Sequence, residues 1–197
     1  MAGEGGVKPP LILASSSPRR RDLLAQIGVT PDAIQSPDID ETPRKGELPR
    51  LYALRMAEEK ARAVERPDGH LVLAGDTTVA LGRRVLAQAD SDAMVAELVG
   101  QLSGRRHHVW SAVALIDAEG RLRSRITDTI VRFKRLSDAE LAAYVASGEG
   151  LSKAGGYAIQ GRAAALIDFL AGSYSGVVGL PLYEVRVLLR AAGYPAD

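Results

Sequence analysis

Two short, almost wholly apolar runs, each ending abruptly in polar residues, constrain the fold more than any other feature of this sequence. One is LILAS at residues 11–15, and the other is HLVLAG at residues 70–75. Such runs are typical of strands that are buried on both faces, as in a sheet covered by helices. The second run continues into GDTT at residues 75–78, where we expect the strand to end.

Helical patterns follow both runs, and hairpin patterns occupy the middle of the chain. Pro18 suits the first turn of a helix that Gly28 would stop. Further helices are expected over 49–66, 91–102, 137–148 and 180–193, hairpins over 78–87 and around AEG at 118–120, and a short strand at 32–36. The segment 162–172 fits a strand or a helix by pattern alone. Together these elements predict an α/β protein with a mixed, twisted sheet.

The composition limits the classes of function. The 197 residues fit a loose Gly- and Pro-rich tail over 1–10 and a single domain over 11–197. Lys and Arg number 25 against 24 Asp and Glu, so the basic excess of a general nucleic-acid binder is absent. A chain without cysteine has no disulfide framework and no thiolate metal site. No apolar run reaches the ~20 residues of a membrane span, and the start lacks the apolar core of a signal peptide. We therefore expect a cytoplasmic protein.

The stretch SSSPRRR, residues 15–21, brings hydroxyls and cations to the expected start of a helix. Free backbone N–H groups at a helix N-terminus bind anions, and serine hydroxyls add donors. Arginines in a first turn oppose the helix dipole, and a bound phosphate would remove that conflict. The alternative is a solvated serine cap followed by exposed arginines, and spacing alone does not decide between the two. The Walker pattern GxxxxGK[ST] is absent.

Two groups of acids are candidates for metal or proton chemistry. Asp76 follows a buried strand, where a carboxylate can hold Mg²⁺ or accept a proton from water. An aspartate that only caps a turn would fit the same pattern. Asp38, Asp40 and Glu41 form the cluster DIDE in a proline-punctuated loop. Such a cluster serves a divalent ion or is simply solvated surface.

The glycine-rich segment SKAGGYAIQG, residues 152–161, is the last polar candidate. Lys153 precedes two glycines that allow close approach to a phosphate, and the Gln160 amide could read a base edge. An ordinary glycine-rich loop is the alternative. His107 and His108 have no third ligand at metal spacing, so we expect them to be strand residues.

Taken together, these segments resemble the Maf family of nucleoside triphosphate pyrophosphatases. The resemblance covers nearly the whole chain, with its blocks in the family's order, and the combination of SxSPRR, KAGGYAIQG and VVGLPL is specific. The matching blocks are LILASSSPRRRDLL, IDE, RMAEEKA, LAGDTTVA, LSGRRHHVWSAVAL, SGEGLSKAGGYAIQG and GSYSGVVGLPLYE.

The resemblance implies a mixed α/β sheet in two lobes around a central cleft, related to the inosine triphosphatase type. It also implies hydrolysis of a nucleoside triphosphate between the α and β phosphates, which gives the monophosphate and pyrophosphate. Mg²⁺ or Mn²⁺ would be the cofactor, and homodimers are common in the family. The implied role is clearing unwanted nucleotides, with a historical link to septum formation.

Individual roles follow by position from the same resemblance. Asp76 matches the acceptor of a proton from the attacking water, and Glu41 matches an acid that helps to hold the metal with it. Lys60 joins these two in the catalytic group and can neutralise phosphate charge. The residues matched to the triphosphate cleft are Ser15, Arg19, Arg20, Lys60 and Lys153.

Base choice is tied by the resemblance to three positions, which are Arg19, Thr77 and Gln160. Threonine and glutamine there are similar to the branch that hydrolyses dTTP and UTP. The branch that hydrolyses 7-methyl-GTP carries an acid in place of Gln160.

The sequence departs from the family pattern at two positions. Gln88 replaces a lysine that usually follows the catalytic aspartate, so one cation facing the phosphates is lost. Gly176 stands where many relatives carry a larger polar residue. The alternatives to a dTTP/UTP pyrophosphatase are therefore a 7-methyl-GTP or broad-specificity enzyme, or a catalytically weak nucleotide-binding regulator of cell division.

Overall fold

A single mixed sheet forms the centre of the molecule. The computed structural model describes residues 8–196, in which the strand order is β2-β1-β3-β5-β6-β7, with β4 paired to β3. β1 is parallel to β2 and β3, and the other neighbours are antiparallel. The predicted mixed sheet is therefore confirmed. The strands are β1 (Leu11–Leu13), β2 (Ala33–Ile34), β3 (Leu71–Leu81), β4 (Arg84–Leu86), β5 (Arg106–Ile116), β6 (Leu122–Phe133) and β7 (Ile167–Ala171).

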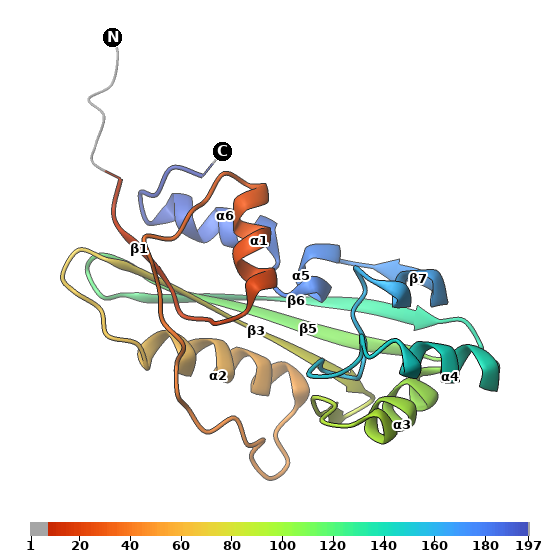
Figure 1. The fold of residues 1–197 in the computed structure, drawn as a ribbon. Helices are drawn as coiled ribbons and strands as arrows, with labels where there is room; N and C mark the ends of the chain where they lie inside the picture. Colours follow the sequence, from red (N-terminus) through yellow and green to blue (C-terminus); the bar gives the residue numbers. More distant parts are fainter. Residues whose placement is uncertain (1–7, 197) are drawn as a thin grey trace.

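Helices cover both faces of this sheet (Figure 1). In Figure 1, α1 and α6 lie on one side of the long strands and α2 on the other, with α3 and α4 near their far end. The helices are α1 (Pro18–Gln26), α2 (Pro49–Arg62), α3 (Asp92–Leu102), α4 (Asp138–Ala146), α5 (Tyr174–Val178) and α6 (Leu182–Ala191). Serine residues cap the N-termini of α3 and α4. The cap of α4 is a full capping box, because the Ser137 side chain accepts from the Glu140 N–H and the Glu140 side chain accepts from the Ser137 N–H.

Several element boundaries differ from the prediction by a few residues. α2 ends at Arg62 rather than near residue 66. The segment 162–172, for which the pattern left helix and strand open, contains both. A 3₁₀ helix over Arg162–Leu166 is followed directly by β7. The second half is extended because β7 pairs with β6, and that pairing is a tertiary contact that local periodicity does not encode.

The core divides between the two ends of the sheet. At the β1 end, leucines of α1 and α6 pack on one face, and the alanines of α2 pack on the other against Ala74, Ala112 and Ala114. At the other end, α3 and α4 enclose Phe133 and Tyr157. These ends correspond to the lobes that the resemblance implies. Small residues on both sides let α2 approach the sheet closely, which brings its polar residues near β3.

An interruption at one edge of β3 positions the functional site. β1 pairs with β3 over residues 71–73, and β4 pairs with it over 79–81. Residues 74–78 between them have β5 on one side and, among residues 8–196, no partner strand on the other. The prediction that the strand ends at residues 75–78 is wrong, because the ladder with β5 carries β3 through this polar stretch.

The described part of the expected tail contacts the domain. Residues 1–7 of that tail lie outside the described residues. Lys8 forms an ion pair with Asp32 at 3.8 Å, and the Pro10 carbonyl accepts a hydrogen bond from the Leu71 N–H at 2.8 Å. Within residues 8–196, none of the helices combines the length and apolar character needed to cross a membrane.

Candidate active site

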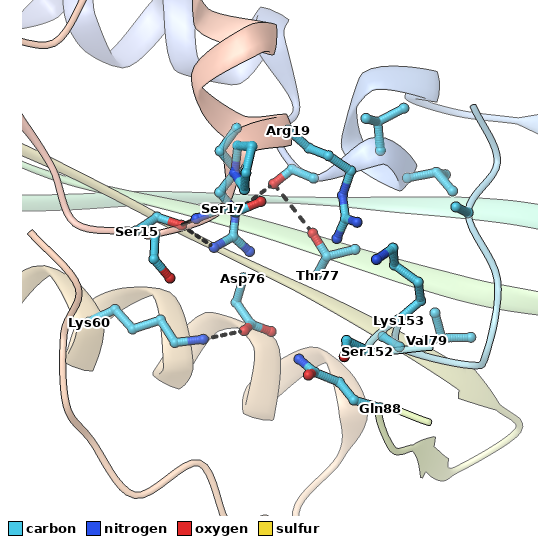
Figure 2. A pocket seen from close by; sticks show the side chains of 18 of the residues that line it. Ser15, Ser17, Arg19, Lys60, Asp76, Thr77, Val79, Gln88, Ser152 and Lys153 are labelled. Atoms are coloured by element: carbon cyan, nitrogen blue, oxygen red, sulfur yellow. Dashed lines mark hydrogen bonds and ion pairs between the residues drawn. The ribbon is translucent and has the colours of Figure 1, made fainter. Parts of the chain in front are cut away.

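A polar cleft of about 410 Å³ lies over the open edge of β3, between the start of α1 and the segment 152–160. Figure 2 shows polar side chains from both walls pointing into it. The structure brings every predicted site residue into the lining of this one cleft. They are Ser15, Arg19, Arg20, Glu41, Lys60, Asp76, Thr77, Lys153 and Gln160, and Gln88 lines it as well.

Lys60 joins the two predicted acids. Its Nζ lies 2.9 Å from Asp76 Oδ1 and 3.0 Å from Glu41 Oε2. Lys60 and Asp76 are 7% and 6% exposed, whereas the Glu41 side chain is about half-exposed. A buried charge requires a partner of opposite charge, and Lys60 and Asp76 serve as partners for each other. The second Asp76 oxygen, Oδ2, accepts a hydrogen bond from the Thr78 hydroxyl at 2.7 Å, so the carboxylate is held on both sides.

Sequence reasoning missed Thr78, although the signal was present. Residues two apart on a strand lie on the same face, so a hydroxyl at position 78 belongs beside a carboxylate at position 76. Thr77 points to the opposite face, where its hydroxyl donates to the Gly179 carbonyl at 3.4 Å. Two consecutive residues thereby reach the cleft from opposite faces of the sheet.

The acidic loop is partly surface and partly site. Asp38 and Asp40 are exposed, while Glu41 enters the cleft lining. The Tyr52 hydroxyl on α2 donates to the Glu41 carbonyl at 2.8 Å and fixes the loop. Burial, with the charges of Asp76 and Glu41 nearby, raises the pKa of Tyr52 to about 12, so this hydroxyl keeps its proton.

The SPRR stretch forms a cationic wall. Arg20 is held by its own neighbours, because Nε donates to the Gly179 carbonyl at 3.0 Å and Nη1 to Ser15 Oγ at 2.9 Å. Burial lowers the pKa of both Arg19 and Arg20, which shows that their charges are poorly solvated. Arg19 reaches over the cleft in the direction of Lys153 (Figure 2). Arg21 is exposed.

The opposite wall is a short antiparallel contact between residues 87–89 and 152–155. Ser152 N–H donates to the Ala89 carbonyl at 2.8 Å, and Ala89 N–H donates to the Lys153 carbonyl at 3.1 Å. Gln88 and Ala154 form a β-bridge between these segments. Burial, and then the nearby charge of Arg19, lower the pKa of Lys153, so this wall and the arginine wall share one electrostatic environment.

The Gly176 departure has a steric explanation. Its carbonyl accepts a hydrogen bond from the buried Ser111 hydroxyl at 2.7 Å. A Cβ at this position would lie 3.1 Å from Ser173 side-chain atoms and 3.2 Å from Ser111 Cβ. A larger residue here would therefore have to displace the hydroxyls that hold α5, whose end lines the cleft.

Comparison with known proteins finds relatives over nearly the whole chain. A dTTP/UTP pyrophosphatase of Sphingopyxis alaskensis is 60% identical over 95% of this chain and 98% of its own length, and one of Novosphingobium aromaticivorans is 55% identical over 98% of both. A solved nucleoside-triphosphatase / dITP/XTP pyrophosphatase of Mycobacterium abscessus overlaps 64% of this chain and 75% of its own, with a TM-score of 0.41 and 22% identity. Residues 10–192 match the family of Maf-like proteins, to which this chain belongs.

Proposed function

We propose that this protein hydrolyses the α–β phosphoanhydride of dTTP and UTP, releasing the nucleoside monophosphate and pyrophosphate. One observation carries the proposal. A buried lysine bridges two carboxylates in a cleft whose other walls carry Arg19, Arg20 and Lys153. The names of the relatives that share 55–60% of this sequence support the same reaction.

The cationic residues suit the polyphosphate. Hydrolysis of a phosphoanhydride requires neutralisation of negative charge on the phosphates, a positioned water and a base. Arg19, Arg20 and Lys153 supply positive charge from two walls, so a triphosphate between them is held at both sides. Ser15 orients Arg20 and leaves the rest of its guanidinium for phosphate oxygens.

Asp76 is the proposed base. Its carboxylate takes a proton from water as the water oxygen bonds to phosphorus and the α–β anhydride bond breaks, and the electron pair of the broken bond goes to the bridging oxygen of the leaving group. Lys60 and Thr78 fix the two carboxylate oxygens, so that little reorganisation precedes proton transfer.

The acids fit a divalent cation, Mg²⁺ or Mn²⁺. Asp76 and Glu41 both line the cleft, and Mg²⁺ is usually held by one or two carboxylates together with substrate phosphates. Over residues 8–196, no group of three or more His, Cys, Asp or Glu side chains forms a metal site. When bound, the ion supplies Lewis-acid stabilisation of phosphate charge.

Thr77, Gln160 and Arg19, which all line the cleft, are the proposed base readers. Hydroxyl and amide groups can donate to and accept from the polar edge of a pyrimidine.

We further propose a cytoplasmic homodimer, which gel filtration and cell fractionation would test.

The decisive experiment is a substrate panel. Purified protein is incubated with dTTP, UTP, CTP, GTP and 7-methyl-GTP, with Mg²⁺ or Mn²⁺, and pyrophosphate is assayed. We expect release from dTTP and UTP, and a loss of at least about a hundredfold in Asp76→Asn. Asp22→Asn, an exposed acid on α1, is the matched control and should behave as wild type.

The other outcomes discriminate among the alternatives. Preference for 7-methyl-GTP would overturn only the base assignment. Nucleotide binding without turnover, unchanged in Asp76→Asn, would favour a regulator of cell division. In that case the absence of a cation at Gln88 would explain the missing turnover. Release from no nucleotide would refute the enzymatic proposal.

A further inference from the structure

A buried polar contact lies beneath the segment 152–160, and the reaction proposed above makes no use of it. The Tyr157 hydroxyl lies 2.7 Å from Nε2 of His107, which is fully buried on β5. Phe133 packs against both rings, edge-on to Tyr157 at 5.1 Å between centroids and stacked on His107 at 6.0 Å. A polar contact is thus enclosed in an apolar cluster.

This contact is not explained by stability. Burial lowers the pKa of His107 to about 4 and raises that of Tyr157, so both are neutral at pH 7, and one hydrogen bond joins the hydroxyl to Nε2. The other ring nitrogen, Nδ1, is buried with no hydrogen-bond partner in residues 8–196. One unpaired buried polar atom costs at least as much free energy as one hydrogen bond contributes. Apolar rings would fill the same space without that cost, but they would lack a directional bond.

The segment that this bond holds has little regular structure of its own. Gly155 and Gly156 adopt left-handed φ values of 67° and 73°, and a Cβ on Gly155 would lie 2.8 Å from Val79 Cγ1. The adjacent Ala158 N–H donates to the hydroxyl of Tyr144, at 3.3 Å. Along the chain, Tyr157 stands between Lys153 and Gln160, both of which line the cleft.

We propose that Tyr157 and His107 are positioning residues, whose hydrogen bond fixes segment 152–160 against the sheet and thereby sets Lys153 and Gln160 in the cleft. The inference rests on the proposed function, in which these two residues contact phosphate and base. Breaking the bond leaves the fold intact and loosens both contacts. Discrimination between bases then falls more than turnover does.

The test uses Tyr157→Phe, His107→Phe and the double variant. Tyr194→Phe is the matched control, since it removes another buried hydroxyl contact, with the Thr30 carbonyl, that is outside the cleft lining. Amide hydrogen exchange in 152–160 of the free protein should rise at least tenfold in the three variants and stay unchanged in Tyr194→Phe. The ratio of kcat/KM for UTP to that for CTP should fall at least tenfold, mainly through KM for UTP.

The two single variants should not add, because they remove the same bond. Unchanged exchange in segment 152–160, or an unchanged UTP/CTP ratio with wild-type KM, would overturn the inference. If Tyr157→Phe fails to fold, His107→Phe tests the same inference, because it removes the same hydrogen bond by changing the other residue of the pair. A wild type that hydrolyses no nucleotide would overturn the proposed function and the nucleotide part of this inference, while exchange would still decide whether the pair anchors the segment.

Discussion

Replacing Arg20 with alanine should lower kcat/KM for dTTP at least tenfold, whereas replacing Arg21 should leave it unchanged. The Arg20 guanidinium is oriented before a ligand arrives, by the Gly179 carbonyl at 3.0 Å and Ser15 Oγ at 2.9 Å. Arg21 is on the same helix, but its side chain is 58% exposed and its charged neighbour is Asp22 at 3.9 Å.

The magnitude follows from the number of contacts at stake. A hydrogen bond to a charged group contributes about 1.5–3 kcal/mol, and each ~1.4 kcal/mol of transition-state stabilisation is a factor of ten in rate. One lost guanidinium–phosphate contact therefore costs at least about tenfold. Arg20→Lys should be intermediate, because a lysine keeps the charge but cannot reproduce the fork that engages Gly179, Ser15 and a phosphate together.

Pyrophosphate release under subsaturating dTTP measures all of these variants on one scale. Arg19→Ala should lose at least tenfold as well, since this side chain lines the cleft and Arg21 does not. Thermal unfolding is recorded for each variant, so that a loss of rate is not confused with a loss of folded protein. Equal losses at all three arginines, or no loss at Arg20, would refute this division of roles.

Three further predictions concern residues outside the predicted site. Thr78→Val should lower kcat for dTTP at least tenfold with little change in KM, whereas Thr78→Ser should keep most of the activity because it retains the bond to Asp76. Glu149→Ala should lower Tm by about 2–4 °C, because its carboxylate accepts from Arg162 N–H at 2.7 Å and Ala163 N–H at 3.3 Å, a cap worth about 1 kcal/mol. Burial depresses the pKa of His107 from 6.5 to about 4, so the unfolded chain binds this proton more tightly. The free energy of unfolding from urea titrations should then fall by about 3 kcal/mol as pH drops from 6.5 toward 4, and His107→Phe should flatten that slope.

Local chemistry determined the elements that were predicted well. The helices expected over 91–102 and 137–148 and the hairpin expected over 78–87 depend on residues close in sequence, and the structure has each of them. The course of β3 through Asp76 depends instead on β5, which begins about thirty residues later along the chain. A polar residue after an apolar run indicates a strand end only when no neighbouring strand continues the ladder.

The candidate site likewise combines features that depend on residues close in sequence with features that depend on tertiary contacts. Motifs led to the residues in the cleft, but not to the contacts between them. Lys60 reaches Asp76 because the alanine face of α2 packs closely on the sheet, and no spacing along the chain encodes that distance. Tyr157 and His107 are 50 positions apart, so their bond becomes visible only when the sheet is formed.

The open edge of β3 explains why these residues meet where they do. Leu71 N–H and the Leu73 carbonyl point toward the β1 side, and Leu81 pairs with Arg84 of β4 on that same side. By the alternation of a strand, the backbone groups of Gly75 and Thr77 also point to this side, where neither β1 nor β4 extends to meet them. Buried backbone polar groups require partners, so water or a polar ligand must occupy this gap. A site built here has backbone donors and acceptors at its floor, and it receives side chains from both faces of the sheet. Filling the gap with a longer β1 or β4 would complete the sheet and abolish the cleft.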